Sequence, residues 1–469
     1  MSPGTLVVRE SDWRRLKAHF AASRFERMAF GICGGAVPEG GSPLFLLREV
    51  DIPAEDEYRG QAAAFVSLKA ERAAPRAVRA RTSGAIAWLD AHSHPFADLP
   101  RPSSVDEQGA LEQARLFRTG ARGIWLVRVI FSGSGLVWAA ASPTDAVHWE
   151  PLGRVVVLSP QRRSVIRPVN APPNGRAWED DAVLHLRTRV LLGSDGEQAL
   201  GGVHALVIGL GGTGQALVRQ LSGYIRHWTL VDPDHIERHN APRLHYYRAG
   251  DEGAPKTEAV MRGLREAFPD REVETINAPF PDPDSLSALR RADIVFCCPD
   301  HHAVRYAAAV EAARWMKPLI EVGCGGRRTD GMITALGYHV RLQAPDGPCL
   351  VCGGLDIRTL EDPASTAGKR RAGYFEDGAV VPGELMSLTT RAASDAAEIA
   401  IRFLTGYATP PPLHLYYDAL RFRSVDLSSC CIPRPGCALC SDGPESLRGV
   451  GDASEDVLVC PIGGHDAAI

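Results

Sequence analysis

The sequence predicts an α/β protein built from two unlike domains, and three observations support this. Up to about residue 158 of the 469-residue chain, helical patterns alternate with β-rich runs. From about Trp178 onwards, short apolar runs typical of buried strands alternate with helical stretches, which favours a parallel sheet with crossover helices. Residues 159–177 between them hold four prolines and little periodicity. We therefore expect domains at 1–158 and 186–440, a linker at 159–185 and a tail at 441–469.

The composition fits a folded protein and excludes several classes. Hydrophobic residues make up 45% and charged residues 23% of the chain, both near the average for globular proteins. The 52 basic and 56 acidic side chains give a net charge of −4, so no excess of positive charge points to nucleic acid or a membrane surface. No apolar stretch is long enough to span a bilayer, and the N-terminus lacks the apolar core of a signal peptide. We expect a cytoplasmic protein.

The elements of the first half can be followed along the chain. The N-terminus reads as a short strand that leads into an amphipathic helix. β-rich runs follow at Leu44–Val50 and Gly123–Phe131, and the half ends near the run VVVL at 155–158. The stretch 70–82 is rich in alanine and arginine and predicts a solvated helix that Pro75 interrupts.

Residues 92–106 carry a pattern typical of a metal site and read HSHPFADLPRPSSVD. Side chains alternate along a strand, so His92 and His94 point to the same side of a strand end. Asp106, at the expected start of a helix, can supply a carboxylate, and Asp98 is the nearby alternative. Three protein ligands leave a fourth position for water, which is the arrangement of catalytic zinc.

This set of residues resembles the JAMM/JAB (MPN) family of zinc metalloisopeptidases over about residues 1–155. The matching residues are Glu26, His92, His94, Pro95, Ser103 and Asp106. The resemblance implies that the glutamate is the general base, that the histidines and the aspartate bind zinc, and that the serine helps to hold an oxyanion. Eleven residues separate His94 from Asp106, one more than the common family spacing, so Asp98 stays an alternative ligand. Glu10 and Glu49 are alternatives to Glu26.

The second half opens with a nucleotide-binding pattern. The apolar run at 203–208 precedes the glycine-rich segment Gly209–Gly214, and a helical run over Gln215–Leu221 follows. Such glycines allow a tight turn and a close approach of phosphate to a helix N-terminus. Asp232 ends the next expected strand and can bind ribose hydroxyls. Up to this point a dinucleotide-dependent dehydrogenase fits equally well.

Charged residues further along favour attack on a phosphate instead. Asn240, Arg243 and Lys256 offer an amide and two cations, which a hydride-transfer site does not need but a leaving pyrophosphate does. Asp300 follows the buried run at 292–298 and is well placed to hold Mg²⁺ beside phosphates.

These residues together resemble the ThiF/MoeB/HesA superfamily, which includes the adenylating domain of ubiquitin-activating enzymes, over about residues 185–440. The matching residues are Gly209, Gly211, Gly212, Gly214, Asp232, Asp234, Asn240, Arg243, Lys256, Asp300 and Arg305. The resemblance implies a Rossmann-like, doubly wound sheet that binds ATP and Mg²⁺. It also implies that Asp232 holds the ribose, that Asn240, Arg243 and Lys256 hold the phosphates, and that Asp300 binds Mg²⁺.

The eleven cysteines are unevenly spread, because ten of them lie between Cys297 and Cys460. This favours a local metal site over a disulfide scaffold. Two C-x-x-C pairs, with 84 residues between them, can supply four thiolates to a closed structural zinc site. The four residues are Cys349, Cys352, Cys437 and Cys440.

A nucleophile that would accept an acyl group is not evident. The interval from Gly353 to about Thr405, where many relatives carry a thioester cysteine, contains no cysteine. It offers hydroxyl groups, for example those of Ser365, Thr366 and Ser387, which need an adjacent base. Direct transfer to a partner, an ester in this interval, or a thioester on Cys431 or Cys460 therefore all remain open, and we favour the first two.

The two halves suggest two reactions on one substrate, the C-terminal tail of a small ubiquitin-like (β-grasp) protein. We expect the second domain to adenylate the tail carboxylate, and the first to trim a precursor or remove the modifier, as in bacterial ubiquitin-like pathways. The expected partners also include a conjugating enzyme and a second copy of the chain. Activation of a sulfur-carrier protein and a non-catalytic module that binds a ubiquitin-like protein are the alternatives.

Overall fold

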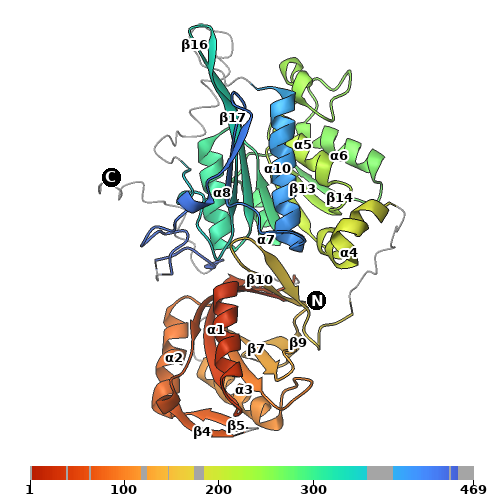
Figure 1. The fold of residues 1–469 in the computed structure, drawn as a ribbon. Coiled ribbons are helices and arrows are strands. Elements are labelled where there is room, and N and C mark those ends of the chain that lie inside the picture. The colour runs from red at the N-terminus through yellow and green to blue at the C-terminus, as the bar shows by residue number, and fades with distance from the viewer. Residues whose placement is uncertain are drawn as a thin grey trace. The chain divides into compact units, whose positions relative to one another are not determined.

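The structure, a computed structural model, divides into two compact units (Figure 1). It describes residues 3–38, 41–62, 65–117, 124–145, 147–173, 184–355, 384–442 and 445–452. The first unit contains the described residues before 158, those of 165–173 and those of 449–452, and the second unit contains 158–164 and the described residues of 184–448.

The first unit is built on a mixed sheet with the strand order β11-β10-β1-β3-β2-β6-β7-β8-β9. Strand β1 runs parallel to β3, and β6 runs parallel to β7, whereas β2 is antiparallel to both of its neighbours. A separate hairpin pairs β4 with β5. The strands are β1 (Thr5–Arg9), β2 (Met28–Ala36), β3 (Leu44–Asp51), β4 (Tyr58–Ala62), β5 (Phe65–Leu68), β6 (Ala87–His94), β7 (Trp125–Ser132), β8 (Val137–Pro143), β9 (Glu150–Pro151), β10 (Arg154–Leu158) and β11 (Arg163–Ile166).

Helices cover both faces of this sheet. On one face, helix α1 (Glu10–Ala21) buries Trp13, Leu16 and Phe20 in a core with the inward side chains of the strands. On the other, α2 (Ala70–Thr82) and α3 (Ser104–Phe117) contribute to a second core around Phe30 and Trp88. Side chains alternate between the two faces of a sheet, and the apolar side chains on each face of this sheet are buried under helices.

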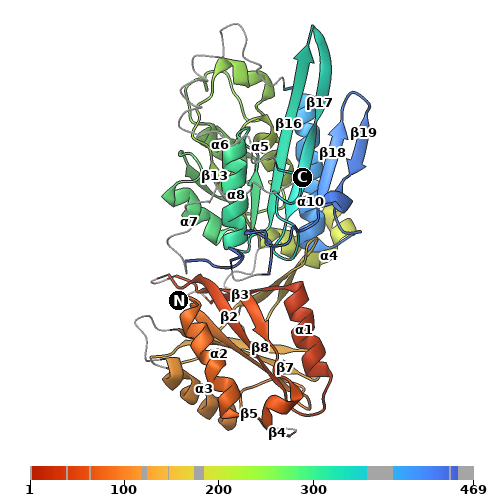
Figure 2. The ribbon, with the colours of Figure 1, turned by 90° about the vertical axis from the view of Figure 1, so that its left-hand side faces the viewer.

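The second unit is an open sheet with the strand order β14-β13-β12-β15-β16-β17-β18-β19. The first five strands in this order are parallel, as the near-continuous apolar sequences of β12 and β15 predict. The last four form antiparallel pairs and lie side by side (Figure 2). The strands are β12 (His204–Ile208), β13 (His227–Val231), β14 (Glu272–Ile276), β15 (Ile294–Cys297), β16 (Leu319–Thr329), β17 (Met332–Gln343), β18 (His414–Asp418) and β19 (Arg423–Asp426).

Helices lie on both faces of this sheet as well (Figures 1 and 2). Helix α10 packs on α4 and α5 and reaches β16 and β17, whereas α7 packs on α8, which contacts β15 and β16. The α-helices are α4 (Leu186–Gly201), α5 (Gly212–Leu221), α6 (Lys256–Ala267), α7 (Pro283–Arg291), α8 (His302–Arg314) and α10 (Met386–Thr405). The short 3₁₀ segments of the two units are η1 (Glu55–Glu57), η2 (Arg238–Arg243) and η3 (Ser428–Cys430). This arrangement is the Rossmann-like α/β fold expected for the second half.

The units differ from the boundaries predicted at 158, 185 and 440. Part of the predicted linker belongs to the second unit, where Gln161 donates from Nε2 to the Pro411 carbonyl (2.6 Å) and Arg163 donates to Asp293 (3.0 Å). Part of the predicted tail belongs to the first unit, where the Asp452 N–H donates to the Gly35 carbonyl (3.0 Å). Among the described residues, none of the helices is both long and apolar enough to cross a membrane.

Candidate functional site

A histidine–carboxylate cluster lies at the end of β6 in the first unit. His92 and His94 lie two residues apart on this strand, so their side chains point to the same face. His92 Nε2 lies 3.2 Å from one carboxylate oxygen of Asp106, and His94 Nε2 lies 3.4 Å from the other. The three candidate ligand atoms all lie within 4.8 Å of one another. The structure therefore brings together the three residues predicted to bind zinc.

A capping box holds the aspartate in place. Ser103 precedes α3, and its Oγ accepts a hydrogen bond from the Asp106 N–H (3.2 Å). In return, Ser103 donates from its N–H and from its Oγ to Asp106 Oδ2 (2.6 and 2.8 Å). This reciprocal pattern is typical of a helix N-terminus. Ser103, expected to bind an oxyanion, is thus a hydrogen-bond partner of Asp106 in this structure.

Glu26, just before β2, is the glutamate that approaches this cluster. Its Oε1 lies 3.7 Å from His94 Nε2. Glu10 instead pairs with Arg14 and Glu49 with Arg79, and Asp98 is not part of the cluster. Burial raises the pKa of Glu26 more than the two histidines lower it, a direction that suits a general base.

The chemistry of the cluster fits a zinc ion. Two imidazoles and one carboxylate form a mixed nitrogen and oxygen set with room for a further ligand, as in catalytic zinc sites. Burial alone would lower the pKa of His92, but Asp106 and Asp90 raise it to about 9. A metal ion would therefore have to displace a proton from this ring.

Two buried charges behind the cluster were not singled out from the sequence. Asp90 and Arg128 lie directly opposite each other in the parallel pairing of β6 with β7, and both are almost fully buried. Each is a charged residue with apolar neighbours on both sides in its strand, Leu89 and Ala91 for Asp90, and Val127 and Val129 for Arg128. That signal was available in the sequence, since buried charges are rare unless they are paired.

The second site lies where the parallel strands of the second unit end. The segment Gly209–Gly214 connects β12 to α5, and Gly209 has a φ of 89°, a left-handed conformation that favours glycine. A Cβ on Gly214 would collide with the carbonyl oxygen of Gly209, whereas one on Gly211 would meet nothing within 4 Å. The loop is therefore tight on one side and open at Gly211.

The buried residues Asp232 and Lys256 form a network with the exposed Asp234 beside this loop. Asp232 accepts hydrogen bonds from the Leu210 N–H (2.5 Å) and from the Asp234 N–H (2.8 Å). Lys256 donates from Nζ to Asp234 Oδ2 (2.7 Å) and lies 3.8 Å from Asp232 Oδ1. Burial alone would lower the pKa of Lys256, but the two carboxylates outweigh it and raise that pKa, so the ammonium stays charged.

The remaining predicted residues have different neighbours. Arg243 is near Asn240 (3.5 Å from Nη2 to Oδ1) and pairs with Glu384, which the sequence did not indicate. A phosphate at Arg243 therefore competes with a carboxylate. The side chain of Asp300 is 57% exposed after β15, so it is open to a ligand.

Arg305 is tied to the protein itself. Its Nε and Nη2 donate to the Pro299 carbonyl (3.0 and 2.9 Å), and its Nη1 lies 3.2 Å from Glu321 Oε1. The guanidinium holds the turn that precedes Asp300, which indicates a positioning role rather than direct contact with a nucleotide.

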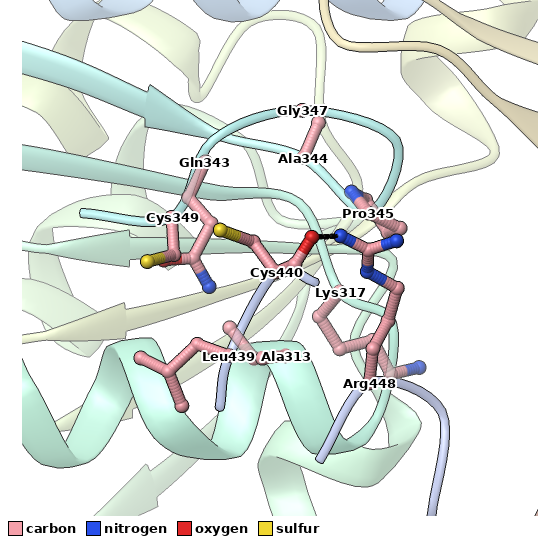
Figure 3. Close-up of a pocket in the computed structure, with 11 residues that line it drawn as sticks. Ala313, Lys317, Gln343, Ala344, Pro345, Gly347, Cys349, Leu439, Cys440 and Arg448 are labelled. Atoms are coloured by element: carbon pink, nitrogen blue, oxygen red, sulfur yellow. Dashed lines mark hydrogen bonds between the residues drawn. The ribbon is translucent and has the colours of Figure 1, made fainter. Parts of the chain in front are cut away.

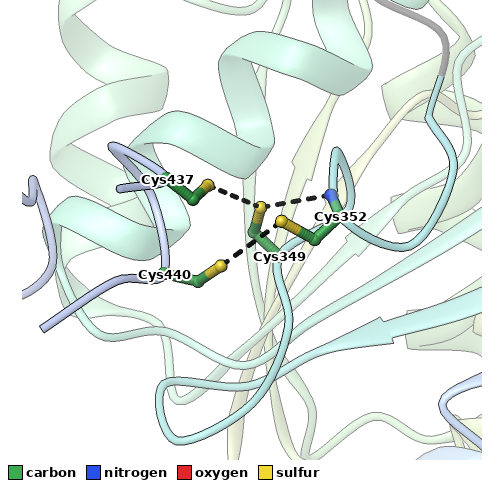
Figure 4. A group of neighbouring side chains, drawn as sticks. All are labelled: Cys349, Cys352, Cys437 and Cys440. Atoms are coloured by element: carbon green, nitrogen blue, oxygen red, sulfur yellow. Dashed lines mark hydrogen bonds between the residues drawn. The ribbon is translucent and has the colours of Figure 1, made fainter. Parts of the chain in front are cut away.

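The four predicted cysteines converge in the second unit (Figure 4). The sulfur of Cys349 lies 3.7 Å from that of Cys437, and that of Cys440 lies 3.6 Å from that of Cys352. The neighbouring thiol of Cys349 lowers the pKa of Cys352 to about 7 and also lowers that of Cys437. Four sulfurs at this spacing can bind a zinc ion in a closed site.

A small pocket lies beside these cysteines (Figure 3). Its lining includes Cys349, Cys440, Lys317 and Arg448. Arg448 donates from Nη2 to the Cys440 carbonyl, which fastens the second cysteine pair to the segment that follows it.

The structure describes some of the candidate acyl acceptors and not others. Ser365, Thr366 and Cys460 lie outside the described residues. Ser387 is exposed at the start of α10, and Cys431 is buried with a pKa raised by its burial.

Comparison with known proteins gives relatives for the second unit. The adenylyltransferase and sulfurtransferase uba4 of Aspergillus fumigatus is 27% identical over 286 residues, which are 59% of this chain and 55% of that protein. The chain thus spans about half the length of this relative. The molybdopterin-synthase adenylyltransferase of Escherichia coli is 28% identical over 269 residues, which are 56% of this chain and 97% of that protein.

Among solved structures, one of Escherichia coli MccB with AMPCPP and MccA has 20% sequence identity and a TM-score of 0.45, over 56% of this chain and 75% of that one. The model of the ThiF family matches residues 185–439, which is more than half of the chain. The chain therefore belongs to the ThiF family.

Proposed function

We propose that the second unit is an adenylyltransferase that uses ATP to activate the C-terminal carboxylate of a small ubiquitin-like or sulfur-carrier protein. The observation that carries this proposal is the meeting of a glycine loop, a buried charged lysine and an exposed aspartate at the ends of parallel strands. Relatives named as adenylyltransferases of molybdopterin synthase and of a sulfur carrier protein support it.

Each residue of the site has a distinct part in this reaction. The N-terminus of α5 faces the phosphates with free N–H groups. Lys256 and Arg243 stabilise negative charge that develops as pyrophosphate leaves. Asp300 would hold Mg²⁺, which supplies additional charge neutralisation when bound. Asp232 orders the loop through the Leu210 N–H and can accept a ribose hydroxyl with a remaining lone pair.

For the first unit, we propose a zinc-dependent peptidase or isopeptidase that acts on the same tail. The observation that carries it is the convergence of His92, His94 and Asp106 with Glu26 beside them. Zinc supplies Lewis-acid activation of water for attack on a carbonyl. Glu26 would accept the proton that the attacking water loses and pass it to the amine, which leaves as the carbonyl carbon–nitrogen bond breaks. Ser103 keeps Asp106 oriented through two hydrogen bonds.

The fate of the adenylate leaves two candidate functions. The interval 353–405 has no cysteine, so conjugation would use a partner nucleophile, an ester in this interval, or a thioester on Cys431 or Cys460, of which the first two are favoured. Activation of a sulfur carrier requires no conjugating enzyme. Two relatives favour it, the adenylyltransferase and sulfurtransferase uba4 of Aspergillus fumigatus and a sulfur carrier protein adenylyltransferase of Thermus thermophilus. Mass spectrometry after incubation with ATP and the candidate small protein separates them. An adduct on a cysteine that reducing agents remove would contradict direct transfer and an ester alike.

The test of both activities uses one pair of variants. Asp300→Ala should lose pyrophosphate exchange that depends on the small protein, by more than about 100-fold, and should keep tail cleavage. His92→Ala should do the reverse. If both variants retain both activities, both site assignments are wrong. If the unchanged protein shows neither activity, a non-catalytic binding module becomes the better explanation. A homodimer and a conjugating enzyme as partners stay predictions, which light scattering and co-purification can check.

A further inference from the structure

The candidate metal ligands rest on a buried ion pair that the zinc chemistry described above does not use. Asp90 is 4% exposed and Arg128 is 1% exposed. The guanidinium donates to Asp90 Oδ2 from Nε (3.1 Å) and from Nη2 (2.7 Å). A buried pair of this kind is costly to desolvate, so its presence beside the cluster suggests a role other than stability.

The same guanidinium also reaches the helix that carries the third ligand. Arg128 Nη1 donates to the main-chain carbonyl of Asp106 (2.8 Å). One side chain on β7 therefore connects β6, which carries both histidines, with the first turn of α3, which carries the aspartate. The plane of Arg128 is itself restrained, because its guanidinium carbon lies 4.9 Å from the ring centre of Trp149.

The other carboxylate oxygen of Asp90, Oδ1, faces His92, which is one of the candidate metal ligands. Asp90 Oδ1 lies 3.7 Å from His92 Nδ1 and has no hydrogen-bond partner although it is buried. The opposite ring nitrogen, Nε2, faces Asp106. A buried carboxylate oxygen without a donor is unfavourable, and a small shift of the ring would give it the Nδ1–H.

We propose that Asp90, held by Arg128, is a positioning residue that keeps the proton of His92 on Nδ1 and so presents Nε2 to the metal. The proposal rests on the metal site proposed above for the first unit. Ligating histidines commonly donate their second N–H to a carboxylate, which fixes the tautomer and the ring orientation. Arg128 in turn holds the Asp90 carboxylate with two hydrogen bonds and connects β6 to the first turn of α3 through the Asp106 carbonyl.

The first test measures zinc affinity in the full-length protein. Competition with a chromophoric chelator gives the Kd, and the difference between the protein and its His92→Ala variant isolates the histidine site from the cysteine site. Asp90→Asn should raise the Kd of the histidine site by about 10- to 100-fold. The matched control is Asp12→Asn, which breaks another buried pair of the same unit, Arg9–Asp12 at 2.7 Å, away from the cluster. This control should leave the Kd unchanged.

Thermal unfolding of the metal-free variants separates positioning from packing. Both variants should unfold at lower temperature than the unchanged protein, because each leaves a buried arginine without its carboxylate. If Asp90→Asn and Asp12→Asn then show the same zinc affinity, Asp90 only packs the sheet and the proposal fails. If the unchanged protein binds no more zinc than His92→Ala, the metal site itself is wrong.

A second measurement needs no substitution near the cluster. Long-range proton–nitrogen NMR of the zinc-loaded protein, with ¹⁵N-labelled histidine, reports which ring nitrogen of His92 carries a proton. A proton on Nδ1 is the expected result. A proton on Nε2, with Nδ1 bound to zinc, would overturn the proposal even if Asp90→Asn does not fold.

Discussion

Two glycines of the loop after β12 are required for different physical reasons. Gly214 leaves no space for a side chain, because its Cβ would collide with the carbonyl oxygen of Gly209. Gly211 has open space around it and a φ of −69°, which other residues can adopt. Of these two positions, the protein's own packing requires glycine at Gly214 and not at Gly211, where a ligand that approaches closely is the remaining reason for glycine.

The two variants should accordingly behave differently. Gly214→Ala should distort the loop and lower the unfolding temperature by several degrees, since overpacking costs about 1–3 kcal/mol. Gly211→Ala should keep the unfolding temperature but weaken ATP binding at least about 10-fold through contact with phosphate. Differential scanning calorimetry and equilibrium ATP binding check these outcomes. Unchanged ATP binding by Gly211→Ala would place the phosphates elsewhere.

At the residue scale, the sequence predicted more of the histidine cluster than of its support. His92 and His94 were predictable because a strand alternates its side chains. Asp106 was predictable because it stands at the expected start of a helix and matches the JAMM/JAB pattern. Arg128 lies 36 residues after His92 along the chain, and its role depends on the parallel pairing of β6 with β7. The register between strands that are distant along the chain cannot be predicted from the sequence of either strand alone.

At the scale of elements, helix α2 contains a residue that weakens it. Pro75 lies inside the helix, so it lacks an N–H for the carbonyl of Glu71, and its ring crowds that turn. Pro75→Ala should raise the free energy of unfolding by about 1–3 kcal/mol. Ala74→Gly in the same turn is the control and should lower it by about 1 kcal/mol. Urea unfolding measures both, and a destabilised Pro75→Ala would show that the proline packs favourably.

The pairing of β17 with β18 brings the half-buried His339 into contact with the buried His414. His339 Nδ1 lies 2.7 Å from His414 Nε2. Burial and the nearby charge of Arg341 lower the pKa of both histidines to about 4. The carboxylate of Glu321 raises these pKa values, but by less. The folded protein thus binds protons here less readily than the unfolded chain, whose histidines titrate near pH 6.5.

The sign of the resulting pH dependence follows. The stability that these neutral rings contribute is complete above about pH 6.5 and is lost as the pH falls towards 4, by at most about 3 kcal/mol for each ring. His414→Gln should make the unfolding temperature less dependent on pH between 7 and 5. The control is His235→Gln at an exposed histidine, which should keep the original dependence. Equal slopes in the two variants would contradict this interpretation.

At the scale of the whole molecule, the described part of the chain carries two separate candidate zinc sites. One uses nitrogen and oxygen donors in the first unit, and the other uses four sulfurs in the second. Metal analysis should therefore find two zinc ions per chain. Cys437→Ser should lose one of them and destabilise the second unit, because a closed site contributes to folding. His92→Ala should lose the other with little loss of stability. If the unchanged protein contains one zinc ion per chain, one of the two candidate sites does not bind zinc.

The fold class was predictable for the second unit because short apolar strands and a glycine loop after the first of them determine a parallel sheet. The exact division of the chain was not. Residues 158–164 and 449–452 are short and lack periodic patterns, so only their contacts assign them, as those of Gln161 with Pro411 and of Asp452 with Gly35 do. Composition alone made them a linker and a tail.

This division affects what a protease can separate. A cut within residues 174–183 yields two fragments, yet 158–164 pack with the second unit and 449–452 pair with β2 of the first, where Gly451 bridges Gly35. Each fragment then keeps a piece of the other's fold, so nicked protein should migrate as one species until it is denatured. Because each fragment contains a segment of the other unit, residues 1–177 and 178–469 should associate into a folded protein when they are expressed as separate chains.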